Sequence, residues 1–445
     1  MADIMTRVAR SASARESAVA DPGGFDRWFA QCATRTHTTV ERVPLDALDR
    51  WRRDPVTGDL RHDSGRYFTV HGLRVHHPEG PVPRWDQPII DQPETGILGI
   101  LVKEFDGVLH CLMQAKAEPG NSDGLQVSPT VQATRSNYTR VHQGGSVPYL
   151  DYFRNAAAQR VIVDVRQSEQ GAWFYRKRNR NMVVETTDEV TVLDGFRWMT
   201  LGQVLALLGR DDVVNMDART VLSCLPFPAG GAPALHRTAD VLSWLTEARS
   251  LTDVRTERVP LNALEGWHDA DGRVCHESGR FFDVIGVDVV AGGREVGRWS
   301  QPMIEPRGTG VIAVLLREFD GVPHVLLHAG AEPGYADVVE LGPTVQCDPA
   351  SYEVLPATAR PRYLDEVLSA GKERIRFEAL LSEEGGRFHH ARNRYLVVDS
   401  DVPADPGHPD YRWLAVRQLT ALLRHSHYLN VQARSLVACL HSVLS

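Results

Sequence analysis

Apolar and polar positions in the first half of the chain predict several strands. Residues 65–75 (GRYFTVHGLRV) alternate between apolar and polar side chains, as expected for a half-buried strand. Two apolar runs surround an EFDG turn at 104–107, which predicts a hairpin over 96–118. Residues 160–169 and 182–189 have the composition of further strands.

Helices are predicted mainly late in this half. Thr200 precedes an apolar stretch, and Gln203 stands three residues further on, which is the spacing of a capping box. Residues 215–225 (NMDARTVLSCL) predict a closing helix. The pattern therefore predicts an α+β fold in which a mixed sheet is flanked by helices.

The second half of the chain repeats the first half. RVPLDALDRW at 42–51 returns as RVPLNALEGW at 258–267, and EFDGVLHCLMQAKAEPGN at 104–121 returns as EFDGVPHVLLHAGAEPGY at 318–335. The offset stays between 214 and 216 residues along almost the whole unit. A period of this length indicates two homologous domains from one duplicated unit, because solenoid repeats are far shorter.

Proline and glycine mark the seam between the two copies, at PFPAGGAPALHRT. The domain organisation that we expect is a flexible lead over residues 1–24, a first domain over 25–226, a linker over 227–239 and a second domain over 240–445. The lead has small and basic residues but no apolar run, so we do not expect a signal peptide.

The composition of the chain argues against several classes of partner and of structural site. The chain has 445 residues and a net charge of −8, so we expect no nucleic-acid partner. Its apolar runs, such as 96–102, are too short to span a bilayer, which argues against a membrane partner. None of its six cysteines stands in a C-x-x-C pair, which argues against a zinc ribbon and a disulfide framework. We expect a cytoplasmic protein without a bound metal.

One segment concentrates cations in this acidic chain. RKRNR at 176–180 follows three aromatic residues, and its R-N-R returns at 392–394. In a strand, Arg178 and Arg180 share one face while Asn179 points to the other. Two guanidinium groups on one face suit an anion with several oxygens, such as a diphosphate. The alternatives are cations that guard an edge strand and a salt bridge that both copies retain.

Other polar positions suit a ligand or the framework of the fold. Residues 128–144 are rich in hydroxyl and amide groups, which suit a polyhydroxylated ligand but also serve turns. Trp51 and Trp267 occupy matched positions, and each is expected either to stack on a ligand or to lie in the core.

The copies differ in charge at two matched positions. Lys116 of the first copy corresponds to Gly330, and Lys177 corresponds to Ala391. This divergence fits one working site and one altered site, and it equally fits drift of surface residues. No G-x-G-x-x-G follows a strand, and neither a Walker sequence nor a G-x-S-x-G elbow is present, so these motifs indicate no dinucleotide, P-loop or hydrolase site.

Several long motifs resemble those of the NDP-hexose 2,3-dehydratases of deoxysugar biosynthesis. They are SPTVQATRSNYT at 128–139, QAKAEPGN at 114–121, QSEQGAWFYRKRNRNM at 167–182 and SEEGGRFHHARNRYLVV at 382–398. The resemblance runs from about residue 25 to the end of the chain. It implies a tandem repeat of a Nudix-like fold, a homodimer and two sugar-nucleotide pockets, one of them catalytic. Neither copy carries the Glu-rich box that holds magnesium in Nudix hydrolases.

The resemblance also implies a substrate and a reaction. The substrate is dTDP-4-keto-6-deoxy-D-glucose, whose C4 ketone acidifies the C3 proton. A base removes this proton, the C2 hydroxyl leaves with the help of an acid, and a 3,4-diketo-2,6-dideoxy sugar results. No hydride moves, so no cofactor is expected, and a 3-ketoreductase that consumes the labile product is expected as a functional partner. The candidate catalytic residues are Glu169, Lys177, His142 and Tyr138, with Glu383 as the rival from the second copy.

Substrate contacts are expected from both copies, with Arg178 and Arg180 facing the diphosphate. The candidates are Trp51, Gln114, Thr130, Gln132, Arg135, Ser136, Asn137, Tyr138, Thr139, Arg178, Asn179 and Arg180 in the first copy, and Trp267, Gln346, Arg362, Tyr363, Asn393 and Arg394 in the second. Two other functions stay open: a Nudix-type NDP-sugar hydrolase and a non-catalytic dTDP-sugar-binding protein.

Overall fold

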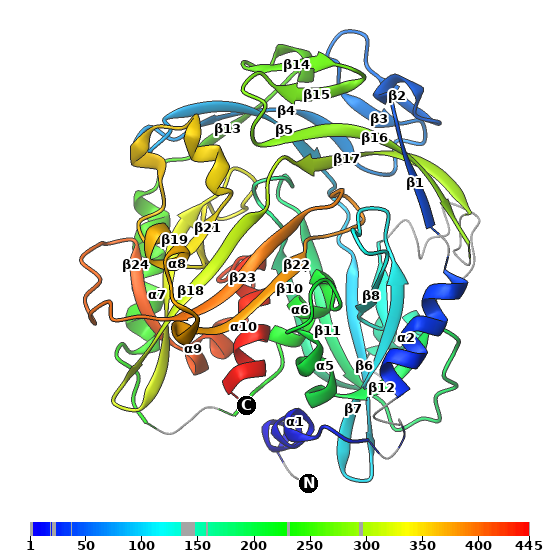
Figure 1. The fold of residues 1–445 in the computed structure, drawn as a ribbon, viewed down its shortest axis with the longest axis vertical. Coiled ribbons are helices and arrows are strands. Elements are labelled where there is room, and N and C mark those ends of the chain that lie inside the picture. The colour runs from blue at the N-terminus through cyan, green and yellow to red at the C-terminus, as the bar shows by residue number, and fades with distance from the viewer. Residues whose placement is uncertain are drawn as a thin grey trace.

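The computed structural model describes residues 3–17, 19, 24–36, 38–134, 147–156, 159–228, 232–292 and 297–444. In Figure 1, the strands of two five-stranded sheets form the upper part of the molecule, and the strands of two seven-stranded sheets form the lower part. Helices lie between and beside the seven-stranded sheets, and the two labelled chain ends lie together at the bottom of the view.

The first copy and the residues before it supply about half of the elements. They are α1 (Ile4–Ser13), α2 (Gly24–Arg35), β1 (Thr38–Val43), β2 (Trp51–Arg53), β3 (Leu60–His62), β4 (Thr69–His76), β5 (Arg84–Asp91), β6 (Ile97–Phe105), β7 (Val108–Ala117), β8 (Leu125–Ser128), β9 (Val131–Ala133), α4 (Leu150–Arg154), β10 (Arg160–Ser168), β11 (Arg178–Glu185), β12 (Phe196–Thr200), α5 (Leu201–Leu207) and α6 (Met216–Ser223).

The second copy supplies the rest, in nearly the same order. Its elements are α7 (Thr238–Leu251), β13 (Arg255–Val259), β14 (Trp267–Ala270), β15 (Arg273–His276), β16 (Phe282–Ala291), β17 (Arg298–Pro306), β18 (Gly310–Phe319), β19 (Val322–Ala331), β20 (Val339–Gly342), β21 (Val345–Cys347), α8 (Leu364–Leu368), β22 (Ile375–Ser382), β23 (Arg392–Asp399), β24 (Tyr411–Ala415), α9 (Val416–Leu422) and α10 (Val431–Leu444).

The seven-stranded sheets have the same topology in both copies. The first has the order β10-β11-β6-β7-β12, and the second has the matched order β22-β23-β18-β19, with β20 and β24 both paired to β19. In each sheet one pair is parallel, β11 with β6 and β23 with β18, while the remaining pairs are antiparallel. The predicted α+β fold with a duplicated mixed-sheet domain is confirmed, whereas its Nudix-like character stays a prediction.

Most predicted elements are present with shifted ends. The hairpin over 96–118 is the antiparallel pair β6 and β7, and the capping box at the start of α5 joins Thr200 and Gln203. The strand predicted over 65–75 begins only at Thr69, because a turn precedes it in which Gly65 N–H donates to His62 O at 2.9 Å. The strand predicted over 182–189 is β11, which begins and ends four residues earlier.

The two copies exchange their first strands. β1 of the first copy pairs antiparallel with β16 of the second copy, and β13 of the second copy pairs antiparallel with β4 of the first. Each five-stranded sheet is therefore built from both copies, so the contacts of the first strands cross the predicted seam. The domain bounds 25–226 and 240–445 stay a prediction about sequence units.

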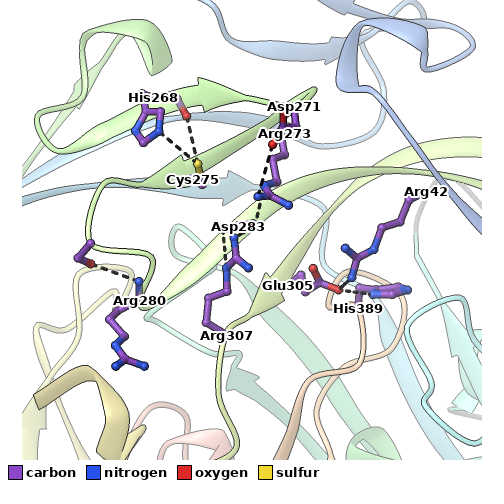
Figure 2. Close-up of polar contacts among 11 residues, drawn as sticks. Arg42, His268, Asp271, Arg273, Cys275, Arg280, Asp283, Glu305, Arg307 and His389 are labelled. Atoms are coloured by element: carbon purple, nitrogen blue, oxygen red, sulfur yellow. Dashed lines mark hydrogen bonds and ion pairs between the residues drawn. The ribbon is translucent and has the colours of Figure 1, made fainter. Parts of the chain in front are cut away.

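A chain of polar contacts connects an exchanged strand to a loop of the second copy. Figure 2 shows Arg42 of β1 and His389 both directed at the carboxylate of Glu305 on β17, and His389 Nδ1 lies 2.9 Å from Glu305 Oε1. Burial alone would raise the pKa of Glu305, but the contacts with His389 and Arg42 lower it. The same figure shows buried Asp283 between Arg273 and Arg307. These ion pairs fix the sheet on which the loop after β22 rests.

The closing helices α6 and α10 pack against each other between the seven-stranded sheets. Each contributes a fully buried arginine, Arg219 and Arg434. Arg434 donates to Thr220 Oγ1 at 2.6 Å and to Ser168 O at 2.5 Å, and Arg219 donates to Ser382 O at 2.6 Å. Each helix of one copy thereby holds the end of a strand in the other copy. No helix in the described ranges is long and apolar enough to cross a membrane.

Candidate active site

The turn after the hairpin in each copy docks onto a loop of the other copy. In one contact, Gly120 N–H donates to Gly385 O at 2.7 Å, and Gly120 O accepts the N–H of His390 at 2.8 Å. In the matched contact, Gly334 N–H donates to Gly171 O at 2.7 Å and its carbonyl accepts Arg176 N–H at 2.8 Å. The loops concerned are 169–177, between β10 and β11, and 383–391, between β22 and β23. Both lie where the two copies contact each other.

This docking gathers ionisable side chains from both copies into one place, called here the first cluster. The first copy contributes Lys116, Glu118, Glu169, Lys177 and Asp217, and the second copy contributes Glu384 and Arg387, which interact electrostatically with the others. Lys116 Nζ lies 3.3 Å from Glu118 Oε1, and the Gln132 amide donates to both Glu118 and Asp217. The candidates Glu169, Lys177 and Gln132 are thus brought together.

Glu169 is held by the R-N-R strand. Asn179 Nδ2 donates to Glu169 Oε1 at 2.8 Å, while Gly96 N–H donates to Asn179 Oδ1 at 2.9 Å and fixes the orientation of the amide. Glu169 is 3% exposed, and its Oε2 is buried without a hydrogen-bond partner among the residues that the structure describes. Arg180 points to the other face and forms a bidentate pair with Asp164 at 2.6 and 2.5 Å. Asn179 therefore positions a carboxylate, and Arg180 forms a salt bridge.

In the first cluster, the pKa values of an acid and of a base are shifted toward 7. Burial raises the pKa of Glu384 to about 7, with the carboxylates of Glu118 and Glu169 adding to this rise. Burial lowers the pKa of Lys177 to about 8, although the negative charge of Glu169 opposes this shift. Burial also raises the pKa values of Glu169 and Asp217. Groups with pKa values shifted in this way can exchange protons near pH 7.

The second copy carries a matched set, the second cluster, that has lost most of this charge. It retains the carboxyl groups of Glu332 and Glu383 at the positions of Glu118 and Glu169. The other matched positions hold Gly330 for Lys116, Ala391 for Lys177, Gln432 for Asp217, Gln170 for Glu384 and Trp173 for Arg387. Five of seven positions are neutral, so the second cluster carries fewer ionisable groups, although burial raises the pKa of its Glu332 to about 7.

The rival carboxylate Glu383 also differs from Glu169 in its hydrogen bonds. Glu383 Oε1 accepts from Asn393 Nδ2 at 2.6 Å and from the Tyr395 hydroxyl at 2.8 Å, and its Oε2 accepts from Gln170 Nε2 at 3.0 Å. Both of its oxygens are therefore occupied. Glu383 must therefore give up a hydrogen bond before either oxygen can accept a proton, whereas Glu169 Oε2 has no such bond to give up among the described residues.

The remaining candidates lie in the framework or in the second cluster. Trp51 is 9% exposed and donates from Nε1 to Ser300 O at 2.8 Å, so the core alternative accounts for its contacts. Thr130 is buried, and its hydroxyl accepts Leu101 N–H at 2.8 Å between two strands. The others are placed as follows: Trp267 donates to Asp86 O, Gln346 donates to Glu332, Tyr363 donates to Pro406 O, Arg394 donates to Glu378, Arg178 and Gln114 are partly exposed at or beside the seven-stranded sheet, and Arg362 is exposed.

Six candidates lie outside the described residues: Arg135, Ser136, Asn137, Tyr138, Thr139 and His142. Their roles stay predictions. Within the described ranges, no group of three or more His, Cys, Asp or Glu side chains is placed to hold a metal ion.

Five members of the first cluster were not among the candidate residues: Lys116, Glu118, Asp217, Glu384 and Arg387. Lys116 stood out in the sequence only as a difference in charge between the copies. A comparison of the two copies position by position would have found Asp217, Glu384 and Arg387, because the residue at each matched position of the other copy is neutral. Glu118 has a carboxylate counterpart, so no such difference marks it.

The substitution Gly120→Ala is expected to separate the two copies at this site. A Cβ at Gly120 would collide with Phe388 O and lie 2.8 Å from Gly385 O, and both atoms are backbone that cannot give way cheaply. The loop that carries Glu384 must then shift, so we expect a loss of activity together with a loss of stability of about 1–3 kcal/mol. Activity assays and urea unfolding would measure the two effects. Gly209→Ala is the control, since Gly209 is exposed and an added Cβ there meets only Ala206 O at 4.0 Å.

Comparisons with known proteins agree with this duplicated architecture. The family model of the NDP-hexose 2,3-dehydratases matches twice, at residues 23–225 and 238–440. Two similar relatives are both named dTDP-4-dehydro-6-deoxy-alpha-D-glucopyranose 2,3-dehydratase. The protein from Amycolatopsis orientalis is 50% identical over 99% of this chain and 94% of its own length, and the one from Saccharopolyspora spinosa is 51% identical over 94% and 91%. The chain belongs to the NDP-hexose 2,3-dehydratase family.

Proposed function

We propose that this protein is a hydro-lyase that converts dTDP-4-keto-6-deoxy-D-glucose to dTDP-3,4-diketo-2,6-dideoxy-D-glucose. Membership of the family and the names of the relatives support the substrate and the reaction type. The observation that carries the proposal is the first cluster. There a buried carboxylate, whose Oε2 accepts no hydrogen bond from the described residues, lies near a buried lysine and a second, partly buried carboxyl group.

The first step is removal of the C3 proton. Glu169 is the base, because its Oε2 accepts no hydrogen bond from the described residues and burial raises its pKa. Negative charge then develops on the C4 oxygen of the enediolate. Lys177, whose Nζ also donates to Glu94 O, places a cation beside Glu169, where it stabilises this charge.

The second step is loss of the C2 hydroxyl. The C2–O bond breaks with its electron pair on oxygen, and a proton donor converts the leaving group to water. The remaining enol, with its double bond between C2 and C3, tautomerises and takes up a solvent proton at C2. The sugar loses one water and nothing is oxidised or reduced, so these residues need to supply only a base, an acid and a cation.

The test is conversion of dTDP-4-keto-6-deoxyglucose in deuterated water, with a 3-ketoreductase and NADPH present to trap the product. We expect a 2,6-dideoxy sugar nucleotide that carries deuterium at C2, detected by mass spectrometry. Free dTMP without a dideoxy sugar would instead identify an NDP-sugar hydrolase. Recovery of bound but unchanged substrate would identify a non-catalytic dTDP-sugar-binding protein.

Three further expectations belong to this proposal, and the first and third of them rest on the family resemblance. The protein forms a homodimer, it acts in the cytoplasm, and its labile diketo product passes to a 3-ketoreductase. Light scattering measures the first, and the need for the ketoreductase in the trapping assay bears on the third.

A further inference from the structure

We propose that Glu384, which the second copy extends into the first cluster, is the general acid that protonates the departing C2 hydroxyl. This inference rests on the proposed function. It makes the active site composite, with the base on a loop of the first copy and the acid on the matched loop of the second copy.

The loop that carries Glu384 is fixed on two sides. Gly385 O accepts the N–H of Gly120 from the first copy at 2.7 Å. On the other side, β17 holds the same loop, because Ile304 N–H donates to Arg387 O at 3.0 Å and His389 N–H donates to Ile304 O at 2.7 Å. A group held by backbone contacts from both copies is pre-organised for proton transfer.

Arg387 anchors the loop against the first copy. Its Nε donates to Gln92 Oε1 at 3.2 Å, and its guanidinium lies over the Phe68 ring, 4.3 Å from the centroid. Its Nη1 donates to Gly386 O at 2.7 Å, so part of the guanidinium is used within the loop itself. Arg387 thus positions the loop and also opposes the rise in the pKa of Glu384.

Among the carboxyl groups of the first cluster, Glu384 is the one best suited to donate a proton. Glu118 is paired with Lys116, and Asp217 accepts the amide of Gln132. The Oε2 of Glu384 is buried and has no hydrogen-bond partner in the described part of the chain, although part of its side chain is exposed. A carboxyl group with a pKa of about 7 is protonated in roughly half of the molecules at neutral pH and can give up that proton.

The matched residue in the second cluster has lost this capacity. Gln170 occupies the position of Glu384, and its amide donates to Glu383 Oε2 at 3.0 Å. An amide cannot supply an acid proton, and here it also occupies the oxygen that a base would need. Gln170 therefore supplies no acid proton and occupies an oxygen of Glu383, which makes the contrast at this position specific to acid–base chemistry.

The proton balance of the step is simple. Glu384 gives its proton to the C2 oxygen as the C2–O bond breaks, water leaves, and Glu384 becomes a carboxylate. Solvent returns the proton to Glu384, and Glu169 loses the C3 proton to solvent, before the next turnover. No oxidant, reductant or metal ion enters.

The test is Glu384→Gln, which installs the residue that the second cluster already has. We expect formation of the trapped dideoxy sugar to fall about 10²–10³-fold. The base is untouched, so the C3 hydrogen of recovered substrate should still exchange with deuterated water. Mass spectrometry and NMR of the recovered sugar nucleotide measure this exchange against a sample without enzyme. Glu340→Gln is the matched control, since it replaces another buried acid by its counterpart Gln126 and keeps the bond to a serine hydroxyl, and it should remain active.

Two outcomes would overturn the inference. One is elimination by Glu384→Gln within about threefold of the unmodified protein, and the other is loss of C3 exchange together with elimination. Should this variant not fold, the unmodified protein decides, because elimination must fall above a pH of about 7 while C3 exchange persists. A failure of the unmodified protein to make any dideoxy sugar would refute the proposed function itself, so the two failures are distinguishable.

Discussion

Replacement of Glu169 by Gln is expected to lower kcat by about 10²–10⁴-fold, the range typical for removal of a positioned general base. The amide keeps the volume of the side chain, and its oxygen can still accept the hydrogen bond from Asn179 Nδ2, so the fold should persist. Without a carboxylate, the C3 proton is not removed. Both dideoxy-sugar formation and C3 exchange with deuterated water should therefore be lost, and the same trapping assay with NMR of recovered substrate measures both.

The matched variant Glu383→Gln tells which cluster is active. Glu383 accepts three donors from described side chains, and its cluster lacks counterparts for Lys177 and Glu384. We expect the Glu383 variant to keep C3 exchange, with any loss arising from stability. The reverse result, in which Glu383→Gln abolishes exchange and Glu169→Gln does not, would place catalysis in the second cluster.

Local features of the fold could be predicted from the sequence because short-range physics determines them. The hairpin over 96–118 follows from two apolar runs around a turn, and the cap of α5 follows from the spacing of Thr200 and Gln203. The predicted ends of the strands were less accurate, as at Thr69, because contacts within the adjoining turns decide where the strand pairing stops.

The exchange of strands could not be predicted, because the copies are so similar. β1 and β13 both end in Glu-Arg-Val at matched positions, so these residues do not indicate whether a segment joins its own sheet or that of the other copy. The docking of Gly120 on the loop 383–391 is likewise a long-range contact without a local pattern. For this reason Glu384 was not named as a candidate from the sequence, whereas Glu169, which adjoins the R-N-R motif, was.

Duplication also explains how one site could lose its charge without loss of the fold. The frame depends on groups that both copies retain, such as Asn179 with Asn393 and Arg219 with Arg434. The positions that diverge, such as Lys177 and Ala391, lie in the clusters between these anchors. Because the two clusters are made of different residues, a single substitution removes a side chain from one cluster only.

Replacement of Arg434 by Met is expected to change both stability and the pH dependence of catalysis. Arg434 is fully buried, and its donors serve Ser168 O, Thr220 Oγ1 and Leu429 O. Three buried acceptors lose their donor, at about 1–3 kcal/mol each, so we expect a loss of about 3–9 kcal/mol in the free energy of unfolding. Urea unfolding measures this loss.

The effect on catalysis follows from the charge of Arg434. Burial raises the pKa of Glu169, and the positive charge of Arg434 opposes that rise. Removal of this charge should raise the pKa of Glu169 further, and the base works only when ionised, so the acidic limb of the pH–rate profile should move to higher pH. Arg219→Met is the matched control, because Arg219 serves Ser382 O and lies beside the Tyr395 ring in the other copy. It should cost a similar amount of stability without that movement. Equal movement of the acidic limb in both variants would mean that Arg434 acts only through the fold, and that its charge does not set the basicity of Glu169.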